Sequence, residues 1–316
     1  MKALIIISVL LIVIGTALFA VAACSVGWDF TKLGAGKYET NTHEISEDFT
    51  DISINTNTAD IVFIPSNDGV CKVTCYEDAK EKHSVKVTDG TLTIEVNNGK
   101  KWYDYIGFYF KTPELTVYLP KTQYNNLVIE ASTGDVDMPE NFAFADVDIS
   151  VSTGDVEYEA SASGKLKICA STGDIEISEL SAGEIELLVS TGKIEASDIV
   201  CEGNIGITVS TGKSVLEDVK CKSLSSSGST GNISLEKVIA TEKLSIKRGT
   251  GDVIFEDSDA AEIFVETSTG NVKGSLMSEK IFVTKTRTGN IDVPKNVTGG
   301  ICEITTSTGN IKITTK

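Results

Sequence analysis

Carboxylates at fixed distances from a recurring Thr-Gly dipeptide are the side chains of this 316-residue chain that most invite a chemical interpretation. One set stands four residues after the Thr of four successive copies: Asp137, Glu157, Glu176 and Glu195. Another set directly follows the Gly: Asp135, Asp155 and Asp174. Carboxylate oxygens suit Ca²⁺, and a strip of them attracts a cationic partner such as a basic peptide. A solvated acidic face that blocks strand pairing would use the same residues, so both interpretations stay open.

We therefore regard the two sets as candidates of different kinds. The three aspartates after Gly are weak candidates for a metal site, and Ca²⁺ is the ion they would suit. Their spacing matches neither an EF-hand loop nor a Gly-Gly-x-Gly-x-Asp calcium repeat. Glu157, Glu176 and Glu195 are candidates for contact with a partner. Beyond that ion, we expect no cofactor.

An aromatic segment is the second candidate for recognition, because the stretch 101–111 reads KWYDYIGFYFK. A cluster of this kind suits a platform for sugar rings or a loop that dips into a membrane. It also suits an aromatic plug that covers the first coil of a repeat array. The aromatic residues are Trp102, Tyr103, Tyr105, Phe108, Tyr109 and Phe110.

Cysteine and histidine usage argues against catalysis. Cys201 and Cys221 hold equivalent positions in successive repeats, so they are either a disulfide within reach or buried small apolar residues. Cys71 and Cys75 are four apart on a predicted strand, about 13 Å, which is too far to bridge. The chain has two His and no GxSxG, HExxH or P-loop. We expect no catalytic residues and no enzymatic activity, and a polysaccharide-active enzyme is the least favoured function.

The charge balance restricts the partners. Lys and Arg total 28 against 45 Asp and Glu, which gives a net charge of −17. A chain this acidic repels nucleic acid, so we expect no nucleic-acid partner.

An internal repeat must position all of these residues. Successive Thr-Gly copies recur every ~19–20 residues, and so constant a period indicates a repeat architecture. The Gly after Thr suits a turn residue with positive φ. The ten copies, which we interpret as structural turns, are Thr133-Gly134, Thr153-Gly154, Thr172-Gly173, Thr191-Gly192, Thr211-Gly212, Thr230-Gly231, Thr250-Gly251, Thr269-Gly270, Thr288-Gly289 and Thr308-Gly309.

Apolar residues alternate with polar ones on both sides of each turn, which predicts two short strands per repeat. So short a repeat leaves no room for a helix and cannot bury a core alone, so the copies must stack. We predict an all-β chain, a parallel β-solenoid of 19–20-residue coils in sequential order with about 4.8 Å between coils. The last strand, ending at Lys316, lacks a cap and should form the free edge of the stack or pair with another chain.

The N-terminus is predicted to lie in or near a membrane. Residues 3–23 form an uncharged apolar run, which matches the roughly 20 residues that a transmembrane helix needs. An uncleaved anchor, a lipoprotein signal with lipidation at Cys24, and an ordinary cleaved signal all fit this run. Each of them places residues 30–316 outside the cytoplasm.

The chain thus divides into four segments. We expect a transmembrane anchor or lipoprotein-type signal over 1–28, a juxtamembrane linker over 29–40, divergent N-terminal coils and a cap over 41–126, and regular β-solenoid repeats over 127–316. Within the third segment, Thr58-Ala59-Asp60 repeats the register with Ala at the Gly position.

The Ser-Thr-Gly-Asp-Ile/Val array, the single N-terminal apolar helix and the stretch Gly27-Trp28-Asp29-Phe30 resemble the DUF4097 family of bacterial β-solenoid adhesins. The resemblance covers about residues 45–316. It implies a single-pass protein of the bacterial cell membrane, with its bulk outside the cytoplasm, that binds an unidentified protein or surface ligand. The alternative function is an envelope-stress or regulatory scaffold that binds a membrane partner or a cationic peptide.

Overall fold

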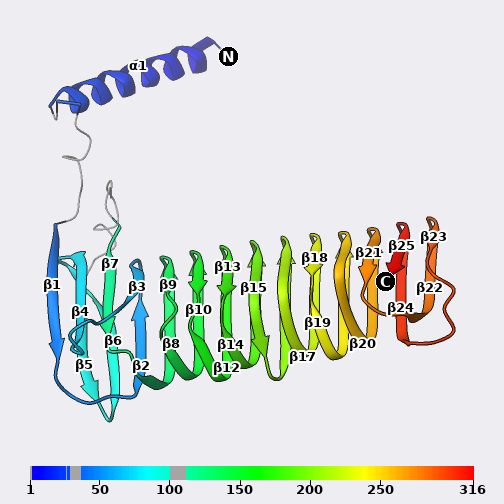
Figure 1. Ribbon diagram of the computed structural model, residues 1–316. Coiled ribbons are helices and arrows are strands. Elements are labelled where there is room, and N and C mark those ends of the chain that lie inside the picture. Colours follow the sequence, from blue (N-terminus) through cyan, green and yellow to red (C-terminus); the bar gives the residue numbers. More distant parts are fainter. Residues whose placement is uncertain (1, 26, 29–36, 100–111) are drawn as a thin grey trace.

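The computed structural model describes residues 2–25, 27–28, 37–99 and 112–316, and its main body is a parallel β-solenoid (Figure 1). The predicted fold class is confirmed. Helix α1 (Lys2–Ser25) is long and apolar enough to cross a membrane, and a signal sequence would share these properties. The predicted aromatic segment at 102–110 lies outside the described residues.

Each regular coil contains a long strand that ends at the Thr-Gly turn and a short strand that follows it. Strands β17 and β20 continue through the next bend and so also supply the short strand of the coil before. The long strands are β8 (Gln123–Thr133), β10 (Ala143–Thr153), β12 (Ser161–Thr172), β14 (Ser181–Thr191), β16 (Asn204–Thr211), β17 (Ser214–Thr230), β19 (Ile239–Thr250), β20 (Val253–Thr269), β22 (Lys280–Thr288) and β24 (Gly300–Thr308). The short strands are β9 (Val136–Met138), β11 (Val156–Tyr158), β13 (Ile175–Ser178), β15 (Ile194–Cys201), β18 (Ile233–Glu236), β21 (Val272–Leu276), β23 (Ile291–Asp292) and β25 (Ile311–Thr315).

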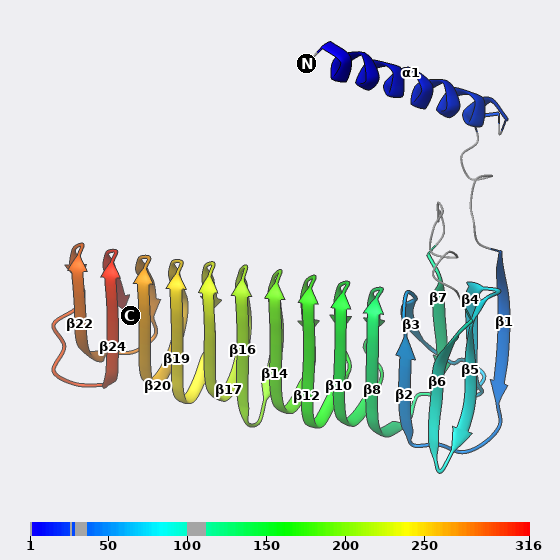
Figure 2. The ribbon, with the colours of Figure 1, turned by 180° about the vertical axis from the view of Figure 1, so that it is seen from behind.

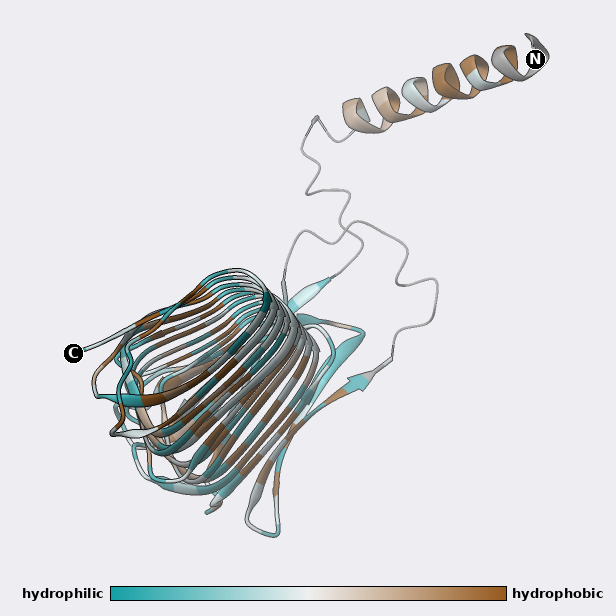
Figure 3. Ribbon diagram, turned by 90° about the vertical axis from the view of Figure 1, so that its right-hand side faces the viewer, coloured by the Kyte–Doolittle hydropathy of each residue, from teal (hydrophilic) through white to brown (hydrophobic). Residues whose placement is uncertain are grey.

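Equivalent residues of successive coils lie directly opposite one another. Thr153 pairs with Thr172, and Thr172 pairs with Thr191, in parallel register. Inward residues therefore stack in columns, and Leu166, Ile168 and Ile175 are fully buried. The view along the rod shows these hydrophobic residues as stripes repeated from coil to coil (Figure 3).

A buried arginine explains two polar exceptions in the apolar columns. The Arg248 guanidinium is buried and donates to the hydroxyls of Ser214 and Ser226, at 3.1 and 2.8 Å. Burial lowers the pKa of Arg248 to about 10. Gly228 leaves the space, because a Cβ there would lie under 3.0 Å from the guanidinium.

The Thr-Gly corner needs glycine for two reasons. The ten glycines have φ between +130° and +156°, a region that L residues rarely adopt. A Cβ added to Gly173 would also lie under 3.0 Å from the carbonyl oxygen of Gly154 in the preceding coil. Glycine at the corner therefore lets the backbones of successive coils approach more closely than a residue with a Cβ atom would allow.

An Asp or Asn follows the Gly in eight of the ten corners and connects one coil to the next, and we call this row the Asx ladder; Lys193 and Lys213 interrupt it. Asp135 Oδ1 accepts the backbone N–H of Asp155 at 2.8 Å, and Asp155 Oδ1 accepts that of Asp174 at 2.7 Å. Asn232 and Asn271 act in the same way farther along. The three aspartates singled out as weak metal candidates each use a carboxylate oxygen to satisfy a turn N–H.

The N-terminal cap contains β1 (Tyr38–Ile45), β4 (Cys71–Asp78), β5 (Glu81–Thr88), β6 (Thr91–Asn98) and β7 (Glu114–Leu119). Strand β4 pairs antiparallel with β1 and β7, and β5 pairs antiparallel with β6 (Figure 2).

The coil of β2 (Asp51–Thr56) and β3 (Asp60–Pro65) lies directly against β8 and β9, although Ile52 and its partner Leu127 are far apart in the sequence. The intervening residues do not stack in sequential order, because β6 and β7 pair with the other side of this coil.

The order of the last two coils differs from the expectation. Strands β24 and β25 lie between the coil of β20 and β21 and that of β22 and β23 (Figure 1). The prediction that the C-terminal strand forms the free edge is therefore wrong, and β22 and β23 form it instead. The coil of β24 and β25 buries Ile304, Ile311 and Ile313, whereas Ile291 of the outer coil is 45% exposed. Placing the more apolar coil between two neighbours removes more apolar surface from water.

We predict that Gly173→Val lowers the free energy of unfolding by about 2 kcal/mol or more, because a β-branched residue resists positive φ and meets the Gly154 carbonyl. Gly206→Val is the matched control, since a Cβ at Gly206 meets nothing closer than 3.9 Å. Urea denaturation of the two variants measures the difference. Equal unfolding midpoints would contradict the left-handed corner.

We predict that Asp155→Ala destabilises the rod by about 1 kcal/mol, since the Asp174 N–H loses its acceptor. Asp155→Asn should retain most of the stability, because Asn fills the same role at other rungs. Thermal unfolding compares the two. If Asn proves as damaging as Ala, then the charge of Asp155 rather than its acceptor oxygen is what matters.

Candidate functional site: a serine-lined groove

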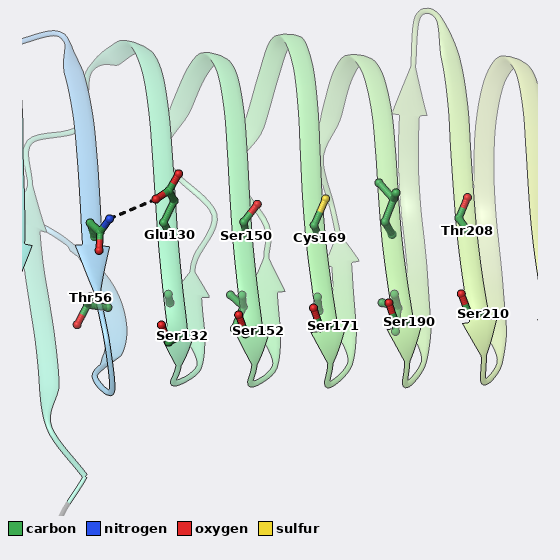
Figure 4. A pocket seen from close by; sticks show the side chains of 16 residues that line it. Thr56, Glu130, Ser132, Ser150, Ser152, Cys169, Ser171, Ser190, Thr208 and Ser210 are labelled. Atoms are coloured by element: carbon green, nitrogen blue, oxygen red, sulfur yellow. Dashed lines mark hydrogen bonds between the residues drawn. The ribbon is translucent and has the colours of Figure 1, made fainter. Parts of the chain in front are cut away.

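A shallow groove runs along the outer face of the long strands, across six neighbouring coils. Its volume is about 680 Å³. Figure 4 shows its two rows of side chains, which come from equivalent positions of β2, β8, β10, β12, β14 and β16. The row nearest the Thr-Gly turn contains Ser132, Ser152, Ser171, Ser190 and Ser210. The second row contains Asn55, Glu130, Ser150, Cys169, Leu188 and Thr208.

Side-chain size creates the hollow. The groove rows carry mostly serine. On the same face, the row two residues farther from the Thr-Gly turn carries Asp148, Lys167 and Glu186. These longer side chains form ion pairs, with 2.9 Å between Lys167 Nζ and Asp148 Oδ2 and 2.5 Å between Lys165 Nζ and Glu186 Oε2. A row of charged residues therefore borders the groove, whose two rows are small side chains apart from Asn55, Glu130 and Leu188.

The hydroxyls of the serine row are free to bind a ligand. The five serines next to the turn are exposed, and none makes a side-chain hydrogen bond within the described ranges 2–25, 27–28, 37–99 and 112–316. Each hydroxyl can both donate and accept. Parallel pairing of the strands that carry them spaces the hydroxyls about 4.8 Å apart along the rod. The row thus offers a ligand one free hydroxyl in each of the five coils from β8 to β16.

The groove ends differ in chemistry. At the end near the cap, Asn55 Nδ2 donates to Glu130 Oε2 at 3.2 Å and so links the coil of β2 and β3 to the first regular coil. Farther along the same face, a second hollow of about 390 Å³ lies over Ser245, Lys247 and Phe264. Lys243 Nζ lies 4.4 Å from the centre of the Phe264 ring. The distal part of the face is therefore more charged and more aromatic than the serine row.

The predicted partner-binding glutamates form a separate feature across the Thr-Gly corner. Glu157, Glu176 and Glu195 pair in register with one another, and Asp137 precedes them. We call these four residues the acidic column. Burial, followed by the charges of Asp137 and Glu176, raises the pKa of Glu157. Lys193 Nζ lies 2.8 Å from Glu195 Oε2 and partly neutralises the end of the column.

The remaining sequence candidates are placed as follows. Cys201 and Cys221 are buried free thiols. The aromatic candidates Trp102, Tyr103, Tyr105, Phe108 and Tyr109 lie outside the described residues. Sequence reasoning assigned the serines before Thr to the turn and missed the groove. The signal was present, because Ser precedes Thr in eight of the ten copies.

Three solved structures are similar to this chain at low sequence identity. A putative adhesin from Bacteroides fragilis NCTC 9343 is 18% identical, covers 88% of this chain and 97% of its own, and has a TM-score of 0.47. A putative lipid binding protein from Parabacteroides distasonis ATCC 8503 is 17% identical, with 88% and 98% coverage and a TM-score of 0.47. A putative adhesin from the same strain is 13% identical, with 89% and 98% coverage and a TM-score of 0.42. No curated protein matches.

The family comparison is more direct. The family model described as Toastrack DUF4097 matches residues 49–210 and 201–316. These ranges contain every Thr-Gly corner, the serine-lined groove and the acidic column. The chain therefore belongs to the DUF4097 (Toastrack) family.

Proposed function

We propose that this protein is a membrane-anchored adhesin that binds an extended polar polymer along its serine-lined groove, outside the cytoplasm. The observation that carries the proposal is the row of five exposed serines, one in each coil from β8 to β16, without internal partners in the described part of the chain. A rigid row of this kind offers hydrogen bonds at a fixed repeat, and ordering it on binding costs little conformational entropy.

A glycan chain is the ligand class that fits this groove best. Sugar hydroxyls donate and accept hydrogen bonds as serine hydroxyls do, and a linear glycan repeats them along its length. The groove is open and shallow, and Cys169 and Leu188 add apolar contact beside the hydroxyls. These features favour a weak contact repeated over several coils, which gains strength through multivalency. They favour binding over catalysis, because a pocket that excludes water is missing from the groove.

The anchor in this proposal is α1, retained as a single transmembrane helix. The helix continues without a break through Cys24 to Ser25, and its apolar segment spans the hydrocarbon core of a bilayer. Lipidation at Cys24 would anchor the same rod on the same side of the membrane.

We predict that Ser171→Tyr combined with Ser190→Tyr weakens glycan binding about tenfold or more, because the two rings fill the groove. Ser181→Tyr is the matched control, as this exposed serine starts the strand that ends beyond Ser190. A glycan array followed by titration of the best ligand with the detergent-solubilised full chain measures both. Retained affinity in the double variant, or an array without any ligand, would refute the groove as the binding site.

A second candidate function is a scaffold that binds a cationic peptide along the acidic column. The raised pKa values of Asp137 and Glu157 favour it, because they indicate carboxylates that would gain from a cation beside them. An ammonium or guanidinium group laid across the column would offset both the burial and the mutual repulsion.

The acidic column predicts a pH dependence that tests the repulsion itself. A carboxyl whose pKa is raised by folding binds its proton more tightly in the folded state, so its contribution to stability falls as pH rises through that pKa. Glu157→Gln should therefore melt at a higher temperature than wild type at pH 7. The difference should vanish below the pKa of Glu157 and shrink in high salt. A lower melting temperature for the variant at pH 7 would show that Glu157 is stabilising.

A further inference from the structure

The N-terminal cap contains a buried cluster of metal-ligating groups that neither the groove nor the acidic column uses. Cys75 and Glu77 stand two residues apart on β4 and point to the same interior face, and His83 lies on β5. The thiol, carboxylate and imidazole atoms lie within 4.8 Å of one another. All three side chains are more than nine-tenths buried.

We propose that Cys75, Glu77 and His83 form a zinc site that braces the cap. Thiolate, imidazole and carboxylate are the ligand set that zinc takes in proteins, whereas Ca²⁺ and Mg²⁺ require oxygen ligands. A tetrahedral zinc ion places its ligand atoms roughly 3.3–3.6 Å apart, given bonds of about 2.0 Å to N and O and 2.3 Å to S. His83 Nδ1 and Glu77 Oε2, which lie 2.8 Å apart, would have to separate by about 0.5 Å, and the Cys75 thiol would have to approach them by at most about 1.5 Å.

Outer hydrogen bonds already orient two of the ligands as a metal site requires. Thr56 Oγ1 lies 2.9 Å from His83 Nε2, which leaves Nδ1 as the nitrogen facing the cluster. Asn41 Nδ2 donates to Glu77 Oε1 at 2.7 Å, and the His83 backbone N–H donates to Glu77 Oε2 at 2.6 Å. Ligands held in this way are typical of zinc sites. In the ion-free protein, Nδ1 and Glu77 Oε2 lie 2.8 Å apart and satisfy one another.

A second histidine provides an independent observation. His43 lies on β1, two residues from Asn41, which pairs with Cys75 in antiparallel register. Its Nε2 atom is buried and has no hydrogen-bond partner in the described part of the chain. Diagonal neighbours of this kind have Cα atoms roughly 7–8 Å apart, within reach of long side chains. His43 is thus placed to become the fourth ligand by a side-chain rotation.

Zinc would also balance the charge of the cluster. A bound zinc ion displaces the thiol proton of Cys75 and pairs two buried anions with a dication. Because Thr56 also lines the near end of the groove, the site would hold that end of the groove in place.

The test uses the full chain in detergent, stripped of metal and titrated with Co²⁺ and then Zn²⁺. We expect about one ion per chain, a sulfur-to-cobalt charge-transfer band, displacement of cobalt by zinc, and a rise in melting temperature. Cys75→Ser and His83→Gln should remove the band and weaken zinc binding about 100-fold or more. Cys71→Ser is the matched control, because Cys71 is buried on the same face of β4, about 13 Å away.

The possible outcomes separate clearly. A wild-type chain without the charge-transfer band overturns the proposal, whatever the variants do. Metal binding that Cys75→Ser leaves unchanged also overturns it, because the ion then sits elsewhere. If Cys75→Ser fails to fold, the near-isosteric Glu77→Gln variant decides, with loss of zinc affinity at unchanged circular dichroism as the expected result.

Discussion

Main-chain hydrogen bonds between coils are the constraint on which the rest of this structure depends. The N–H of Gly154 donates to Thr172 O at 3.0 Å, and the N–H of Val156 donates to Asp174 O at 2.9 Å, one coil further on. Parallel bonds of this kind hold each residue opposite its equivalent in the next coil. Any slip by one residue would turn the apolar columns outward. Register, core and outer surface are therefore fixed together.

The same constraint gives the surface its character. Every outward position recurs in each coil, so side chains of one type line up in a row along the rod. Rows of serine form the groove, and a row of carboxylates forms the acidic column. The free end is different. From residue 271 onward the chain has seven Lys or Arg and three Asp or Glu, against a net charge of −17 overall. Lys285 and Arg287 lie on the edge strand β22, where cationic side chains discourage pairing with another sheet.

Much of the fold can be predicted from the sequence, because the spacing of the repeat determines which residues of successive coils lie opposite one another. The constant distance between Thr-Gly copies, with Ile or Val three residues after Thr in most of them, is enough to predict stacked coils. The residues that break the repeat pattern are explained only by the three-dimensional structure. Ser214 and Ser226 break the apolar pattern at different phases, and a single buried Arg248 accounts for both. The exchanged order of the last coils also escapes prediction, since β22 and β24 both end at a Thr-Gly turn and the repeat period does not rank them.

The candidate sites were harder to predict, for physical reasons. The groove arises because the side chains of its rows are smaller than those of the neighbouring row. A search for repeats detects the period of the sequence and does not compare side-chain sizes. The cap cluster joins a strand to the next strand along the chain, so its residues have no standard zinc spacing. Cys75 and Glu77 alternate as strand residues do, but only the fold brings His83 to them.

Distances between spin labels test the stacking account most directly. A label at Ser152 would be paired with one at Ser307 or at Arg287, after replacement of the accessible Cys24 and Cys169 by serine. With about 4.8 Å per coil, the account predicts roughly 34 Å to residue 307 and roughly 38 Å to residue 287. The residue later in the sequence is thus the nearer one. A shorter distance to residue 287 would contradict the exchanged order, and distances that do not scale with coil number would contradict the stack itself.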